Sequence, residues 1–157
     1  MRYSYLIAAG LLAIVGMASA ANDPYNGLWK IDDSKSGWSD GNFPKNMSLS
    51  IQLKVTGDEI VYHSINDTNK EKKANTVDYT AKADGKDNPL TGGGRYNMVS
   101  IRRVSKDEYE VLEKKDGDVI VFAIWQMLPG NKTFVRRGMA KGVDGKAHEY
   151  EEFFNKQ

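Results

Sequence analysis

The strongest constraint on the fold is a strict alternation of apolar and polar residues between positions 47 and 56. The run reads Met47-Ser48-Leu49-Ser50-Ile51-Gln52-Leu53-Lys54-Val55-Thr56. Successive side chains of a β-strand point to opposite faces, so this run predicts a strand with one buried face and one solvated face. Period-two segments fill most of the chain after residue 26, and helical spacing is nearly absent. The sequence therefore predicts an all-β fold.

Short connections between these segments predict an antiparallel meander. The dipeptides Asp84-Gly85, Asp116-Gly117 and Asp144-Gly145 are typical of hairpin turns, because glycine tolerates the positive φ that tight turns require. A meander of this length removes its edges by closing on itself. We expect an up-and-down β-barrel of about 8–10 strands. The expected strands are 27–33, 47–56, 59–66, 74–83, 97–104, 108–115, 118–128, 132–141 and 146–155.

Two short motifs carry a resemblance to a known family. Asn26-Gly27-Leu28-Trp29 places a G-x-W motif on the opening strand, as in lipocalins, and the chain resembles the lipocalin-like proteins of bacterial periplasms. The stretch 79–87 with Thr91-Gly92 is similar to a pattern of small exported bacterial proteins, which implies no activity. The resemblance implies a barrel with a ligand in its interior and an arginine stacked on Trp29 near the base.

The N-terminus has the pattern of an export signal. Residues 1–20 contain one basic residue, an apolar run from Leu6 to Met17, and Ala18-Ser19-Ala20 before a cleavage point. The apolar run is shorter than the roughly 20 residues that span a bilayer. We therefore expect a signal peptide at 1–20, cleaved after Ala20, and a single lipocalin-like domain at 21–157. The expected location is the periplasm, with secretion as the alternative.

Composition limits the partners of the mature chain. The sequence has no cysteine, so neither a lipid anchor on an N-terminal cysteine nor a disulfide is available. We expect no attachment to the membrane after cleavage. Without Arg2, 21 Lys and Arg face 21 Asp and Glu. This neutral balance argues against nucleic acid as a partner, because phosphate binding calls for basic excess.

Turn geometry predicts which side chains face the interior, since directly paired residues of antiparallel strands share a face. A two-residue turn at Gly57-Asp58 pairs Leu53 with Tyr62 and Ile51 with Ser64, which leaves His63 outside. The turn between Ser105 and Asp107 favours Arg103 inside, with Val99 and Ile101. A two-residue turn at Asp116-Gly117 puts Tyr109, Val111, Phe122 and Ile124 inside.

The same reasoning applied to Asp144-Gly145 places charged residues in the interior. It pairs Val143 with Lys146, Met139 with Tyr150, Arg137 with Glu152, and Val135 with Phe154. Arg137 and Glu152 are expected to neutralise one another, because buried charges are usually paired. Arg103 lacks a neighbouring acid, so a ligand carboxylate is its expected partner. The predicted ligand-binding residues are Trp29, Tyr62, Tyr79, Arg103, Arg137, Tyr150 and Glu152.

Chain direction predicts which loops surround the open end of the barrel. Counting nine strands places the loops 33–46, 66–73, 105–107 and 129–131 at one end, where lipocalins have their mouth. The loop 84–96 then falls at the closed end. With Gly92-Gly93-Gly94 it is expected to be flexible or to hold an extra short strand.

The sequence names no reaction, and three functions remain open. Only His63 and His148 are available, without metal-binding spacing, so no metal or other cofactor is expected. No cysteine or G-x-S-x-G serine offers a nucleophile. The first hypothesis is binding of a small apolar or amphipathic, acidic molecule. The second is a cofactor-independent lyase, isomerase or cyclase using Tyr150 and Glu152, which the sequence favours less than a structural ion pair.

The third hypothesis concerns the segment 118–128, which is apolar on both faces. Its predicted outer face carries Val119, Val121, Ala123 and Trp125 and needs cover, because large apolar patches are rare on monomers. The cover would come from a protein partner, a homodimer contact or the loop 33–46.

Overall fold

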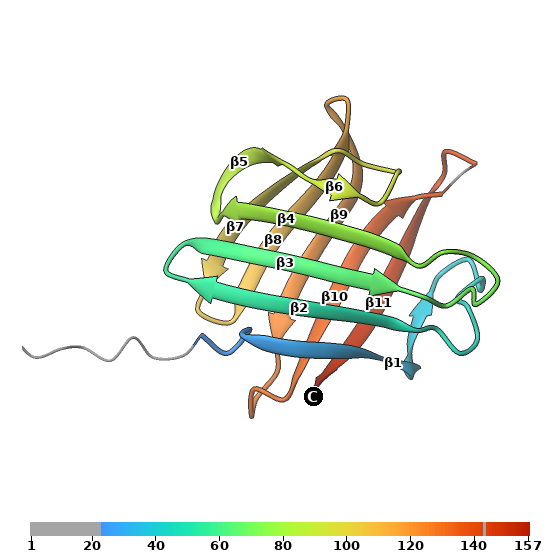
Figure 1. Ribbon diagram of the computed structural model, residues 1–157, viewed down its shortest axis with the longest axis horizontal. Coiled ribbons are helices and arrows are strands. Elements are labelled where there is room, and N and C mark those ends of the chain that lie inside the picture. The colour runs from blue at the N-terminus through green and yellow to red at the C-terminus, as the bar shows by residue number, and fades with distance from the viewer. Residues whose placement is uncertain (1–22, 143) are drawn as a thin grey trace, which may run out of the picture.

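The computed structural model describes residues 23–142 and 144–157, which contain eleven strands and no helix (Figure 1). The strands are β1 (Gly27–Trp38), β2 (Leu49–Thr56), β3 (Glu59–Asn66), β4 (Asn75–Lys82), β5 (Asp84–Pro89), β6 (Thr91–Gly92), β7 (Met98–Ser105), β8 (Glu108–Lys115), β9 (Asp118–Met127), β10 (Thr133–Lys141) and β11 (Ala147–Lys156). In Figure 1, β2–β4 cross steeply in front of β8–β11. Both layers contribute buried residues to the core. The nine expected strands are present, and the first continues to Trp38.

The strands form one antiparallel sheet that curls into a nearly closed barrel. Its order is β5-β7-β8-β9-β10-β11-β1-β2-β3-β4-β6. The two short strands β5 and β6 are its edges, and β4 contacts both β5 and β7 without sharing a ladder with them. The predicted all-β, lipocalin-like barrel is confirmed.

The strands β5 and β6 correct the predicted positions of the loops. Asp84-Gly85 is not a hairpin turn, because Asp84 begins β5, and β5 pairs with β7 rather than with β4. The additional strand reverses the chain direction once more than expected. The loops 105–107 and 129–131 therefore lie at the closed end, called the base below, while residues 90–97 lie at the mouth with the loops after β1 and β3.

Aromatic side chains fill the base of the barrel. Tyr25 and Trp29 are fully buried against Phe134, with ring centroids at 5.7 Å and 5.0 Å, and Phe134 stacks on Phe154 at 4.9 Å. The Trp29 indole donates a hydrogen bond to the Tyr25 carbonyl at 2.8 Å. The cation over the Trp29 ring is Lys156, at 5.1 Å, rather than the expected arginine. The segment before β1 thus plugs this end.

The β2–β3 hairpin has the predicted register. Leu53 pairs with Tyr62, Ile51 with Ser64, and His63 lies outside opposite Gln52. His63 is half-exposed and contacts the carboxylate of Asp78 at 2.5 Å.

The β8–β9 hairpin turns at Asp116-Gly117 as predicted, but its register shifts beyond the turn. Lys115 pairs with Asp118, whereas Tyr109 pairs with Trp125 and Val111 with Ala123, because the ladder is irregular between Glu113 and Lys114. An extra residue in one strand exchanges its faces. Phe122 is therefore 36% exposed, and Ala123 and Trp125 are buried. The predicted inward Phe122 and Ile124 are wrong, and so are the predicted outward Ala123 and Trp125, whereas Val119 is 39% exposed as expected.

The β10–β11 hairpin is also shifted by one residue from its predicted register. The Gly142 amide donates to the Lys146 carbonyl at 2.7 Å, and Lys141 pairs with Ala147, so three residues rather than two connect the strands. Gly145, with φ 78°, has the left-handed conformation typical of such a loop. Arg136, not Arg137, pairs with Glu152, and Met139 is 46% exposed.

The predicted signal peptide lies outside the described residues. In the described part of the chain, no helix is long and apolar enough to cross a membrane.

Candidate ligand-binding site

A cavity of about 370 Å³ opens at the mouth of the barrel. Small-molecule sites typically enclose about 300–1,000 Å³. The walls come from β2–β4 on one side and β8–β11 on the other, and the loops after β1 and β3 and the segment 93–96 form the rim. The lining residues include Trp38, Met47, Leu49, Tyr62, Ser64, Asn66, Val77, Arg95, Tyr96, Glu113, Ala123, Trp125, Arg136, His148, Tyr150 and Glu152.

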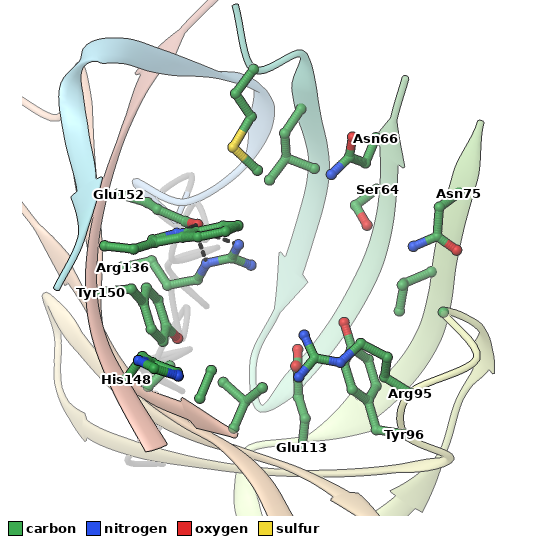
Figure 2. A pocket seen from close by; sticks show the side chains of 18 of the residues that line it. Ser64, Asn66, Asn75, Arg95, Tyr96, Glu113, Arg136, His148, Tyr150 and Glu152 are labelled. Atoms are coloured by element: carbon green, nitrogen blue, oxygen red, sulfur yellow. Dashed lines mark hydrogen bonds and ion pairs between the residues drawn. The ribbon is translucent and has the colours of Figure 1, made fainter. Parts of the chain in front are cut away.

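An ion pair forms one wall of the cavity (Figure 2). Arg136 donates from Nε and Nη2 to one oxygen of Glu152, at 2.9 Å and 2.5 Å. The second oxygen of Glu152 accepts a hydrogen bond from the Trp38 indole at 3.2 Å. The two charged side chains are 16% and 4% exposed. Burial alone would lower the pKa of Arg136, but Glu152 and the nearby acids and phenols raise it, so the guanidinium stays charged.

A second carboxyl group, Glu113 on β8, lies on the same wall of the cavity, two strands away from Arg136. Figure 2 shows Glu113 beside Tyr96 and Arg95, separated from Arg136 and Glu152 by open space. Glu113 is 8% exposed on β8, and burial raises the pKa of its carboxyl despite the opposing effects of Arg136 and the Tyr96 hydroxyl. Among the residues that the structure describes, Glu113 takes part in no ion pair within 4 Å.

Aromatic rings form the deep part of the cavity. Tyr62 stacks on Tyr79, with ring centroids 4.5 Å apart and nearly parallel planes, and also packs against Trp125 at 5.8 Å. Burial raises the pKa of both tyrosines, which keeps them neutral. In the described chain, the Trp125 indole N–H and the Tyr79 hydroxyl are buried without a hydrogen-bond partner. The cavity thus has an apolar, aromatic floor with an unused donor.

The rim carries residues from three connections. His148 on β11 lies between Asp40 of the loop after β1, at 3.8 Å, and Asp144 of the β10–β11 loop, at 3.6 Å. Arg95 donates a hydrogen bond to the Lys141 carbonyl. Trp38 packs edge-to-face on Phe43 at 5.5 Å, so the aromatic residues of the expected 33–46 loop do lie at the mouth.

Three of the seven predicted binding residues line the cavity: Tyr62, Tyr150 and Glu152. Tyr79 lies behind Tyr62, and Trp29 belongs to the packed base. These two residues support the site without lining it.

Both predicted arginines lie elsewhere. Arg137 is exposed on the outer face, where it donates to the Gln126 side chain at 2.7 Å. Arg103 lies at the base, where Asp23 binds its guanidinium at 2.8 Å, so the prediction that it lacks an acid and lies near the mouth is wrong. The predicted Arg137–Glu152 pair is wrong as well, since Arg136 takes that place.

The residues that sequence reasoning missed are Arg136, Glu113, Tyr96, Trp38 and Trp125. A connection one residue longer than the assumed two-residue turn would have paired Arg136 with Glu152. Gly142, a second glycine close to Asp144-Gly145, is the sequence signal for such a longer connection. No comparable signal marks the irregular ladder that brings Trp125 and Val121 to the inner face together with Glu113.

Within the described ranges, no group of three His, Cys, Asp or Glu residues could hold a metal ion. The expectation that the chain uses no metal or cofactor stays a prediction.

Comparisons with known proteins define the fold. No family model matches the chain, and no curated protein matches its sequence. Two similar solved structures are a fatty acid binding protein of Schistosoma mansoni in complex with arachidonic acid and the apo lipid binding protein 8 of Caenorhabditis elegans. The first is 11% identical, with a TM-score of 0.59 over 87% of this chain and 98% of that one. The second is 13% identical, with a TM-score of 0.52 over 92% and 100%. The chain has the barrel fold of the fatty acid binding proteins.

Proposed function

We propose that the exported chain binds a small amphipathic molecule in the mouth cavity. The observation that carries this proposal is a cavity of about 370 Å³ with an aromatic floor and polar groups on its walls. This combination is typical of small-molecule sites. The fold supports the proposal by analogy, since two solved barrels of this fold are named as a fatty acid binding protein and a lipid binding protein.

Binding is favoured over catalysis by the state of the residues proposed for acid–base chemistry. Glu152 accepts hydrogen bonds from Arg136 and Trp38 on both oxygens, so it is held as an ion pair rather than as a free base. Tyr150 is partly buried beside Arg136, and burial raises the pKa of its hydroxyl. In the hypothesis of partner docking through the outer face of 118–128, Trp125 cannot be a contact residue, because its side chain is 2% exposed and lines the cavity.

A cavity-filling variant tests the proposal. Ala123 is buried on β9 and lines the cavity, so Ala123→Leu places three further carbon atoms in the space proposed for a ligand. A neutral fluorescent apolar probe such as Nile red should bind the wild-type protein saturably at one site. Its affinity should fall at least about tenfold in Ala123→Leu, which corresponds to about 1.4 kcal/mol.

Ala147→Leu is the matched control, because Ala147 is exposed at the start of β11. It makes the same chemical change outside the cavity and should leave the probe affinity unchanged. Probe binding that is absent in the wild type, or equal in both variants, contradicts the proposal.

The proposed location is the periplasm, and the N-terminal pattern of residues 1–20 supports it. Expression of the full chain in a bacterium with two membranes should yield periplasmic protein that begins at Ala21. N-terminal sequencing of the periplasmic fraction checks this, and recovery of the intact 157-residue chain from the cytoplasm alone would contradict it.

A further inference from the structure

The cavity holds more acidic than basic groups. Arg136 is its one buried cation among the described residues, and Glu152 neutralises it at 2.5 Å. Glu113 on β8 is the second buried carboxyl, and it has no ion pair in the described part of the chain. Arg95 is at the exposed rim, with its guanidinium bound to the Lys141 carbonyl. A ligand carboxylate would therefore be the third carboxyl group around one buried guanidinium.

A ligand carboxylate is also poorly suited to replacing Glu152 as the partner of Arg136. Both donors from Arg136 reach the same carboxylate oxygen, and Trp38 holds the other one. A ligand carboxylate that replaced Glu152 would leave this carboxylate buried with only the indole N–H. Separating a buried ion pair in this way is strongly unfavourable.

The groups that remain for a ligand are an acceptor and a donor. The Glu113 carboxyl faces the cavity and accepts hydrogen bonds, and the buried Trp125 indole N–H has no acceptor in the described chain. A hydroxyl group both donates and accepts, so it suits either position. A carboxylate only accepts, so it suits Trp125 alone, and an ammonium only donates, so it suits Glu113 alone.

We propose that the cavity selects amphipathic molecules whose polar end is a hydroxyl group, that Glu113 is the residue that receives this hydroxyl, and that carboxylates are disfavoured. This inference rests on the binding function proposed above. It assigns Glu113 as a specificity-determining residue and gives the ligand class as aliphatic alcohols and hydroxylated lipids. It also replaces the acidic ligand expected from the sequence.

Three ligands with the same twelve-carbon chain test the inference: 1-dodecanol, laurate and dodecylamine. Each is titrated at pH 7 against the wild-type protein loaded with Nile red, and displacement gives its affinity. Dodecanol should bind at least about tenfold more tightly than laurate and more tightly than dodecylamine. Such a difference corresponds to about 1.4 kcal/mol.

Variants at position 113 test whether Glu113 causes the selectivity. In Glu113→Leu the hydroxyl loses its acceptor and laurate loses a repulsive neighbour, so the ratio of the two affinities should approach one. Glu113→Gln keeps an acceptor oxygen without the charge and should retain dodecanol binding while laurate binding improves. Glu110→Leu is the control, because Glu110 lies on the outer face of β8 and pairs with Arg102 at 2.8 Å. It should leave the ratio unchanged.

The outcomes separate this inference from the binding function. Laurate or dodecylamine binding as tightly as dodecanol, or a ratio that Glu113→Leu and Glu113→Gln leave unchanged, overturns the hydroxyl assignment while binding in the cavity stands. A purely structural role of Glu113 would weaken all three ligands equally and also overturns it. If neither the probe nor any ligand binds the wild type saturably, the proposed function fails and the inference fails with it.

Discussion

Glu113 shows how one buried carboxyl links the site to the stability of the fold. Burial raises its pKa, so the folded protein holds this proton at pH values where the unfolded chain has released it. The unfolded state then binds fewer protons, and the stability falls as pH rises from the ordinary glutamate pKa through the raised one. Ionisation of the buried Glu113 carboxyl is therefore a cost to the fold.

Glu113→Gln should remove this cost. We expect a higher Tm than the wild type at pH 7 and a difference that shrinks towards pH 4, measured by thermal unfolding across this range. A gain of about 1 kcal/mol raises Tm by roughly 2–4 °C in a chain of this size. Glu110→Gln on the exposed face serves as the control and should show no such pH-dependent gain. A constant difference at all pH values would contradict the proposed cause.

The Arg136–Glu152 pair should show strong coupling in a double-mutant cycle. Arg136→Met or Glu152→Leu alone leaves one buried charge unpaired, which costs on the order of 3–5 kcal/mol, whereas the double variant can be nearly neutral. Urea unfolding of the four proteins measures the coupling. Arg137→Met, one residue along the strand, removes an exposed arginine and should cost less than about 0.5 kcal/mol. Additive effects at 136 and 152 would argue against a buried pair.

At the scale of the hairpin, the alternation of apolar and polar residues and the turn residues predict where the strands lie. They predict less well which residues of two neighbouring strands pair. Gly57-Asp58 is a two-residue turn, so the faces of β2 and β3 follow directly from the sequence. The β10–β11 loop has three residues, and the ladder between β8 and β9 is irregular. Each departure is one residue, yet one residue exchanges the two faces of a strand. This exchange explains why the sequence predicted Arg137 and Phe122 inside instead of Arg136 and Trp125.

Gly138 fixes the spacing between β9 and β10. A Cβ atom added there would lie 2.0 Å from the Phe122 carbonyl oxygen, which is backbone that cannot move aside cheaply. Gly138→Ala should therefore destabilise the protein by about 1–3 kcal/mol, as overpacking typically does. The control is Gly37→Ala on β1, where nothing lies within 4 Å of the added atom. Chemical denaturation compares the two, and equal effects would contradict the close approach.

At the scale of the whole barrel, the short edge strands decide where the site lies. The sequence predicted that the sheet closes into a barrel with an open mouth at one end. Both predictions rested on the number of strands. The sequence allowed for an extra short strand within 84–96 but did not place β5, because the segment 84–89 has neither alternation nor β-branched residues to mark it. One additional strand reverses the direction of the chain, so Arg103 was assigned to the mouth although it lies at the base. The tyrosines Tyr62 and Tyr150 were found because their strands carry clear inward positions.

The two ends of the barrel should differ in local stability. The base is packed with the rings of Tyr25, Trp29, Phe134 and Phe154, whereas the mouth surrounds a cavity, and the edges β5 and β6 pair on one side only. Local opening is rarest where buried apolar contacts are dense. Native-state hydrogen exchange should therefore be slowest for backbone amides of β1, β10 and β11 near the base and fastest in β5 and β6.

Adding dodecanol should slow exchange mainly in the mouth halves of β3, β8 and β11, since a ligand that binds only the folded protein stabilises the segments that hold it. The base amides, which we expect to open only with global unfolding, should change no more than the overall stability does. Exchange that is uniform along each strand, or protection by dodecanol confined to the base, would contradict this division of the barrel into a packed end and a binding end.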